Sequence, residues 1–159
     1  MVKNKLVGNF LAELLKAIPV TSNLCARVLV GQTYYVPNYM AGDVCSAIEQ
    51  NTDIDDNFYN TAMYYNNPEA AKQVALHSLL YRQLLKFAYD NNYLSTRPWN
   101  VDEPHYEIIF SHIMNDVVID SCFTTESFSH VNFCSYDAAK RAIEKIVRPF
   151  MKEHPDFVW

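Results

Sequence analysis

Glycine is scarce in this sequence. Only Gly8, Gly31 and Gly42 occur among its 159 residues. P-loops and dinucleotide-binding turns need several closely spaced glycines, because there the backbone must approach a phosphate group. The chain therefore carries neither motif. The acidic run DIDD at residues 53–56 also fails as a calcium loop, because no glycine and no terminal glutamate follow it at the required spacing.

Paired cysteines are missing as well. Cys25, Cys45, Cys122 and Cys134 show no C-x-x-C spacing. A chain of this length, half of it hydrophobic, can bury a core without disulfide or metal cross-links. We therefore expect a reduced protein whose thiols are buried or inert.

Long apolar runs are absent too. No stretch approaches the roughly 18 apolar residues of a membrane span. The opening run MVKNKLVGNFLAELLKAI is interrupted by Asn9, Glu13 and Lys16, which is atypical of a signal peptide. We expect no membrane association and a cytoplasmic location.

Apolar residues at helical spacing predict an amphipathic helix over residues 1–19. Its stripe contains Leu6, Phe10, Leu14 and Ile18, and Pro19 ends it. The helix either packs on its own domain or forms a homo-oligomer.

Strand-like runs and one capped helix make up a predicted first α+β half, residues 20–91. Residues 25–36 and 58–65 are rich in β-branched and aromatic residues, which is typical of strands, with Gly31 as a bend or a bulge. Residues 43–49 fit either a strand or one helical turn. Asn67 then predicts the cap of a helix that runs to about Tyr89.

A second half, residues 105–159, repeats this order after a proline-containing linker at 92–104. Residues 105–110 and 116–122 predict a hairpin, residues 130–133 a short third strand, and Ser135 the cap of a helix reaching about Lys152.

The two helix openings resemble each other, since NNPEAAKQV and CSYDAAKRA begin 68 residues apart. We therefore predict an α+β fold of two similar strand-strand-strand-helix halves with mainly antiparallel sheet, which could form one compact domain.

Charge is unevenly distributed along the chain. No Lys or Arg lies between Arg27 and Lys72, or between Arg97 and Lys140, whereas these intervals hold six and seven acidic residues. This pattern predicts acidic, tyrosine-bearing strand surfaces. Such surfaces repel phosphate, so direct nucleic-acid binding is disfavoured, and they attract a partner with a basic surface. The alternative is that the acids only solubilise exposed strands.

Catalytic and metal-binding patterns are weak. Cys122, His130 and Cys134 come nearest to a zinc ligand set, but they lack a cysteine pair at knuckle spacing. Cys134 and His130 could form a nucleophilic pair, although no motif positions them. We expect no metal, no cofactor and no catalytic site.

Four runs of the sequence carry a resemblance to known proteins. They are GQTYYV, FYNTAMYYNNPEAAKQVALHSLLYRQLLKFA, HYEIIF and VNFCSYDAAKRAIEKI. Together, over residues 31–150, they resemble small α+β accessory proteins common in bacteriophage and prophage genomes. The resemblance implies a protein that binds a host defence protein or joins the virion, and it implies no catalytic residues.

The function predicted from these features is non-enzymatic. An acidic, tyrosine-rich strand surface binds a basic site on a host protein and inhibits, for example, a nucleic-acid-processing defence enzyme, as anti-CRISPR proteins do. The alternatives are a virion component, and a small-ligand binder or hydrolase with His105, His130 and Cys134 in a pocket between the halves. The predicted partner-binding residues are Tyr34, Tyr35, Asp53, Asp55, Asp56, Tyr64 and Tyr65.

Overall fold

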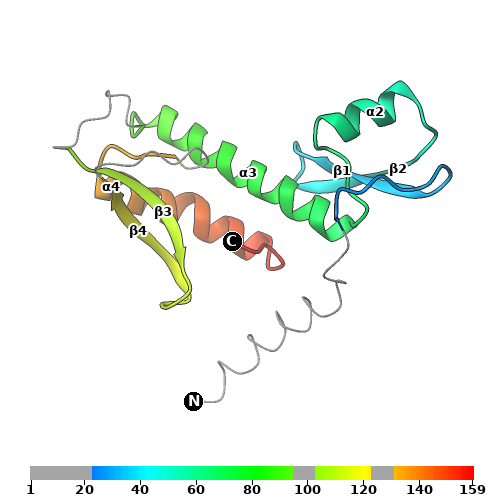
Figure 1. Ribbon diagram of the computed structural model, residues 1–159. Helices are drawn as coiled ribbons and strands as arrows, with labels where there is room; N and C mark the ends of the chain where they lie inside the picture. The colour runs from blue at the N-terminus through cyan, green and yellow to red at the C-terminus, as the bar shows by residue number, and fades with distance from the viewer. Residues whose placement is uncertain (1–22, 95–102, 123–130) are drawn as a thin grey trace, which may run out of the picture. The chain divides into compact units, whose positions relative to one another are not determined.

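The computed structural model describes residues 23–94, 103–122 and 131–159 (Figure 1). Within the chain two compact units form, Met1–Val36 with Val44–Ala71, and Pro37–Asp43 with Lys72–Trp159. Each unit has its own hydrophobic cluster. The described elements are antiparallel hairpins and helices, which confirms the predicted α+β class. The predicted N-terminal helix and most of the predicted linker lie outside the described residues.

The first unit contains most of the hairpin of β1 (Thr33–Asn38) and β2 (Asp43–Ile48), with α2 (Asp53–Asn60) beside it (Figure 1). The turn of this hairpin, Pro37–Asp43, belongs to the second unit. The segment at 43–49 is therefore a strand. The strand predicted over residues 25–36 is shorter than expected and begins at Thr33. Gly31 forms the predicted bend, with a φ of 88°.

Residues 58–65 were predicted as a strand, and this prediction is wrong. Phe58 to Asn60 end α2, and Ala62 follows with a φ of 56°, a conformation that breaks a strand. Only Tyr65 pairs with β1, through two backbone hydrogen bonds with Tyr35 of 2.8 and 2.9 Å. The next residue, Asn66, donates its N–H to the Leu24 carbonyl at 3.0 Å.

The long helix α3 (Pro68–Asp90) begins as its sequence predicts. The side chain of Asn67 accepts a hydrogen bond from the Ala70 N–H at 3.0 Å, and Pro68 follows it at the first helical position. No helix in the described part of the chain combines the length and hydropathy needed to cross a membrane.

The second hairpin pairs β3 (His105–Ser111) with β4 (Asp116–Cys122), which confirms the predicted hairpin. Its register runs from His105 opposite Cys122 to Ser111 opposite Asp116. Of the third strand predicted at 130–133, residue 130 lies outside the described residues, and among residues 131–133 only Phe133 pairs as a strand residue. Phe133 exchanges two backbone hydrogen bonds with Tyr106, and the N–H of Cys134 donates to the Tyr93 carbonyl at 2.8 Å.

A second helical stretch closes this unit. It consists of α4 (Tyr136–Ala142), the π-helical turn η1 (Ile143–Val147) and α5 (Arg148–Glu153). Ser135 caps it as predicted, accepting a hydrogen bond from the Ala138 N–H at 3.2 Å.

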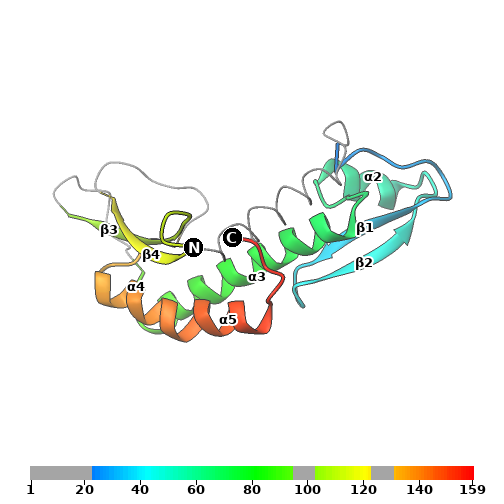
Figure 2. The same ribbon diagram turned by 90° about the horizontal axis from the view of Figure 1, so that it is seen from below.

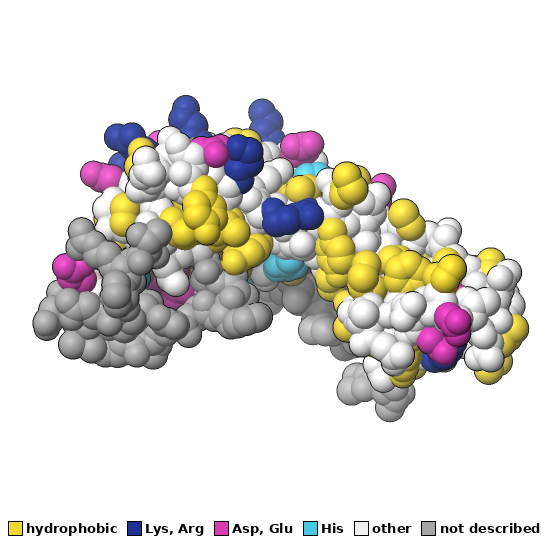
Figure 3. Space-filling view, turned by 90° about the horizontal axis from the view of Figure 1, so that it is seen from above, with side chains coloured by type: hydrophobic (Ala, Val, Ile, Leu, Met, Phe, Trp, Pro, Cys, Tyr) yellow, Lys and Arg dark blue, Asp and Glu magenta, His cyan; other side chains and the backbone are white. Residues whose placement is uncertain are grey.

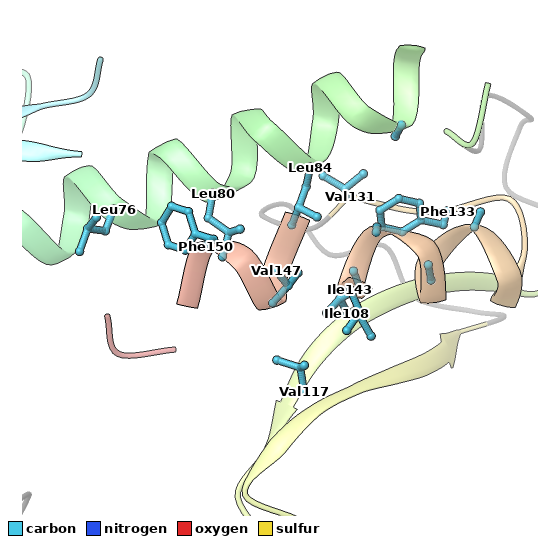
Figure 4. Close-up of a cluster of buried hydrophobic side chains, with 14 residues drawn as sticks. Leu76, Leu80, Leu84, Ile108, Val117, Val131, Phe133, Ile143, Val147 and Phe150 are labelled. Atoms are coloured by element: carbon cyan, nitrogen blue, oxygen red, sulfur yellow. The ribbon is translucent and has the colours of Figure 1, made fainter. Parts of the chain in front are cut away.

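The core of the second unit lies where α3, the α4–α5 stretch and the hairpin meet. The α4–α5 stretch runs alongside α3 (Figure 2). Leu80 and Leu84 extend from α3 into the cluster, and Ile108 of β3 points towards Ile143 (Figure 4). Alanines at the start of α4 are fully buried and bring its backbone close to its neighbours.

Gly42, in the turn between β1 and β2, combines a positive φ with close packing. Its φ is 67°, and a Cβ atom there would lie 2.8 Å from Leu79 Cδ2 and 3.1 Å from Leu76 Cδ2. We expect Gly42→Ala to lower the free energy of unfolding by about 1–3 kcal/mol, measured by urea denaturation.

Gly31→Ala is the matched control, because Gly31 has a positive φ of 88° but no heavy atom within 4 Å of the position that an alanine methyl group would take. It should cost less than Gly42→Ala. Equal losses would show that backbone strain alone, without packing on α3, explains the requirement for glycine.

Candidate functional site

Two stacked tyrosines form the centre of the first unit. The rings of Tyr34 and Tyr64 lie 4.1 Å apart at an interplanar angle of 12°, and each side chain is 1 % exposed. Tyr34 comes from an inward-facing position of β1, and Tyr64 from the segment after α2. Because a buried hydroxyl group must find a hydrogen-bond partner, each ring requires a polar group beside it.

The hydroxyl of Tyr34 donates to Asp55 Oδ1 at 2.8 Å. The other oxygen of this buried carboxylate accepts from the Thr52 N–H at 2.9 Å, the Thr52 hydroxyl at 2.8 Å and the Gln50 N–H at 3.1 Å. Thr52 and Asp55 also form the capping box that starts α2. The hydrogen bond from the Thr52 backbone, followed by the one from Tyr34, holds the pKa of Asp55 well below its usual range.

The hydroxyl of Tyr64 donates to Glu49 Oε2 at 2.8 Å. Arg27 binds both oxygens of the Glu49 carboxylate, at 3.0 and 2.9 Å, and the Asn51 N–H donates to it at 2.8 Å. The hydrogen bonds from Arg27 are the main cause that lowers the pKa of Glu49. Burial, and then the hydrogen bond to Glu49, raises the pKa of Tyr64 to about 12.

Arg27 forms the outer, half-exposed end of this network. Besides Glu49, its guanidinium group binds Asp56, and it lies 5.9 Å from the centre of the Tyr59 ring. The hydrogen bonds to Glu49 and then Asp56 raise the pKa of Arg27 further above its already high value. The tyrosine–carboxylate network, defined as Arg27, Tyr34, Glu49, Asp55 and Tyr64, thus links a β-hairpin, a helix cap and a loop.

The chemistry open to this network is limited. Both carboxylates stay charged and accept several hydrogen bonds, and both tyrosines keep their protons at neutral pH. In the described residues, no buried side-chain nitrogen or oxygen lacks a hydrogen-bond partner. The network is therefore suited to holding the first unit together, and it offers no unpaired base or nucleophile within it.

The seven predicted partner-binding residues divide into inner and outer groups. Tyr34, Asp55 and Tyr64 are buried, so a partner at the surface cannot contact their side chains. Tyr35 and Tyr65 are half-buried and pair through their backbones. Asp56 is bound by Arg27, and Asp53 is exposed in the first turn of α2.

The predicted acidic surfaces are also interrupted by cations. Arg148 of α5 binds Asp116 of β4 at 2.8 Å, just as Arg27 binds acids of the first unit. On the face shown in Figure 3, acidic side chains lie among Lys and Arg side chains instead of forming one continuous patch. Clustering of acids in the sequence therefore overstates the negative charge that a partner meets.

The other predicted chemical groups do not converge in the described residues. His130 lies outside them, and so does the side chain of Cys122, while His105 is buried in β3 and Cys134 is exposed. No group of three His, Cys, Asp or Glu residues within the described ranges could hold a metal ion. We expected thiols that are buried or inert, and burial is wrong for Cys25, Cys45 and Cys134, which are free and exposed.

Sequence reasoning missed Arg27, Glu49 and Thr52. The motif T-x-x-D at residues 52–55 is a helix-start signal, and it could have located both α2 and the hydrogen-bonded role of Asp55. No local signal links Arg27 to Glu49, which lies 22 residues further along the chain.

Apolar side chains are exposed beside the network. Hydrogen bonds of 2.8 and 2.9 Å between Glu49 and residues 31 and 32 hold the preceding loop next to the end of β2, from which the chain enters α2. These segments carry four large apolar side chains that are between 49 % and 73 % exposed. They are Leu29, Val30, Ile48 and Ile54, here termed the apolar surface of the first unit.

Comparison of the chain with protein-family models, with curated proteins and with solved structures finds no match.

The hydrogen bond from Tyr64 to Glu49 can be tested by Tyr64→Phe. The substitution leaves Glu49 with one donor fewer and removes the acceptor of the Val28 N–H, which lies 3.2 Å from the hydroxyl. We expect a loss of about 1–3 kcal/mol in the free energy of unfolding, measured by urea denaturation. Tyr59→Phe is the control, since Tyr59 is exposed, and it should change stability by less than about 0.5 kcal/mol. Similar effects of both variants would contradict the role of the Tyr64 hydroxyl.

The buried carboxylate of Asp55 predicts a specific pH dependence. Because its folded-state pKa is lowered, its contribution to stability is present above its unfolded pKa of about 4 and is lost as the pH falls below that value. Asp55→Asn should therefore be less stable at neutral pH and lose less further stability on acidification, in thermal unfolding followed by circular dichroism. Asp53→Asn, an exposed neighbour, should keep the wild-type profile. If the stability of Asp55→Asn and that of the wild type changed with pH in parallel, the lowered pKa of Asp55 would not be the cause of the pH dependence.

Proposed function

We propose that the chain is a non-enzymatic interaction protein of phage type, which binds a basic site on a host protein through its first unit. The observation that carries this proposal is the apolar surface of the first unit. The buried hydrophobic cluster of this unit consists of Tyr34, Val36 and Tyr64, whereas its exposed apolar surface has four members. Exposed apolar side chains that gather on one surface with polar residues at its edge are typical of a protein–protein contact site.

Charge gives this surface a preference among partners. Asp53 is exposed next to Ile54, in the first turn of α2. Acidic side chains around an apolar contact speed encounter with a basic partner and disfavour acidic ones. The proposed contact therefore combines apolar burial with electrostatic steering.

The residues predicted from sequence take two different roles in this proposal. Tyr34, Asp55 and Tyr64 build the support, since they fix β1 against the start of α2. Asp53 and Ile54 at the start of α2 then contact the partner. The rigid capping box beneath them supports this division, because pre-ordered contact residues lose less entropy on binding.

The class of partner rests on the resemblance to phage accessory proteins and on the sign of the charge. A host enzyme that processes nucleic acid must carry a basic groove, and such a groove would attract this acidic chain. The proposed site of action is the host cytoplasm, and the proposed effect is inhibition by occupying the groove.

We also propose that the two halves are copies of one ancestral unit. What supports this is a common backbone pattern: Tyr65 pairs with Tyr35, and Phe133 pairs with Tyr106, in each case the first strand of the preceding hairpin. In both halves a helix then begins three residues later, and the two pairing residues are 68 positions apart, as are the two helix caps. The helix α2 is the main departure of the first half from this pattern.

The proposed contact can be tested by capture of host proteins on immobilised full-length chain. We expect one predominant basic protein, retained at about 50 mM salt and weakened at about 200 mM. Asp53→Lys should reduce capture most strongly at low salt, because it reverses an exposed charge, and Ile54→Ser should reduce it at both concentrations. Asp55 must not be used in such a test, since its replacement is expected to disturb the fold.

Asp120→Lys is the matched control, because Asp120 is an exposed acid on β4 of the second unit. It should leave capture unchanged. Equal capture by wild type, Asp53→Lys and Ile54→Ser would overturn the assignment of the first unit as the binding surface.

A further inference from the structure

The second unit contains a pocket of about 720 Å³. All its lining residues belong to this unit, on α3, β3, the segment before α4 and the segment after α5. Small-molecule sites commonly measure roughly 300–1,000 Å³, are mainly apolar and carry a few polar groups. The size of this pocket is therefore suitable for a small molecule rather than for solvent alone.

The pocket floor is continuous with the hydrophobic core. Leu80 and Leu84 of α3, Ile108 of β3 and Phe133 are core residues that also line it. They extend from separate elements into one cluster, as Figure 4 shows for the labelled side chains. Because these side chains are fixed by core packing, the floor is formed before any ligand binds.

One wall of the pocket is aromatic and held in place by Gln73. The Gln73 side chain donates to the Asp156 carbonyl at 2.8 Å and accepts from the Val158 N–H at 3.0 Å. It therefore binds the backbone on both sides of Phe157. Phe157 lies 4.8 Å from the His77 ring and 6.0 Å from the Trp159 ring, measured between centroids. These contacts give an ordered aromatic wall.

Polar atoms enter the lining from α3 through His77, Ser78 and Tyr81. Half of the lining residues are aromatic or carry an imidazole ring: His77, Tyr81, Phe133, Phe157 and Trp159. Flat rings favour a flat ligand, because stacked and edge-to-face contacts add to the burial of apolar area. A ligand with a saturated hydrocarbon chain would gain only the free energy of burying apolar area, without ring contacts.

We propose that this pocket binds a small, planar aromatic molecule of two or three fused rings that carries one hydrogen-bonding group. The rings lie between the core residues of α3 and the wall of Phe157 and Trp159, and the polar group bonds to His77 or Ser78. This site is separate in residues and in chemistry from the proposed partner surface of the first unit.

The test uses 2-naphthol as the probe and Trp159 as the reporter. The chain has two tryptophans, Trp99 and Trp159, so Trp99→Phe leaves Trp159 as the only one. We expect saturable quenching of Trp159 emission in full-length Trp99→Phe protein, and weaker binding of octanoate, measured by competition. Absence of saturable quenching would overturn the site, and equal or tighter binding of octanoate would overturn the aromatic class.

Two matched substitutions locate the probe. Ser78→Phe places a ring in the pocket, whereas Gln83→Phe places the same ring on an exposed position of α3. Ser78→Phe should weaken 2-naphthol binding about tenfold or more, which corresponds to about 1.4 kcal/mol, and Gln83→Phe should not. If Ser78→Phe fails to fold by circular dichroism, His77→Ala replaces it, because His77 is exposed and touches Phe157. Unchanged affinity in the folded variant would place the probe elsewhere and contradict the proposal.

Discussion

The stacking of Tyr34 on Tyr64 is the contact on which the first unit depends. These rings are most of its buried hydrophobic cluster, and a unit this small has little other apolar area to bury. Each tyrosine also brings a hydroxyl group into the core. The hydroxyl of Tyr34 donates a hydrogen bond to Asp55, and that of Tyr64 donates one to Glu49. Asp55 in turn accepts hydrogen bonds in the cap of α2, and Glu49 accepts them from Arg27. Removing one member leaves its neighbours with buried, unpaired polar atoms, so the unit is cooperative through hydrogen bonds as well as through packing.

The tyrosine–carboxylate network reduces the number of acidic side chains that remain at the surface. Acids that are closely spaced in the sequence turn inward or pair with arginine, and only some of them remain on the surface. In the proposed function, the first unit therefore binds its partner mainly through exposed apolar side chains, and the remaining surface acids favour a basic partner. The second unit differs from the first in the size of its hydrophobic core. This core packs the helices and the hairpin together and also lines a pocket.

Elements with local signals could be predicted from the sequence. Asn67 and Ser135 start their helices as expected, and the hairpin of β3 and β4 follows two runs of β-branched and aromatic residues joined by a short turn. The helix α2 was missed because the aromatic residues from Phe58 to Tyr65 have strand propensity, while the cap that decides the structure lies before them at Thr52. The burial of Asp55 and Glu49 could not be predicted, because their partners Tyr34 and Arg27 are distant in sequence and only the fold brings them together.

The most direct test of the central claim is an NMR titration of the Asp55 side-chain carboxyl carbon in the intact chain. If Asp55 is buried and accepts hydrogen bonds from Tyr34 and Thr52, its pKa will lie well below the usual range, and its signal will not shift until the protein unfolds in acid. A titration midpoint near 4, as in an exposed aspartate, would contradict the account. The tyrosine–carboxylate network would then not exist in solution, and the division into inner and outer residues would fail with it.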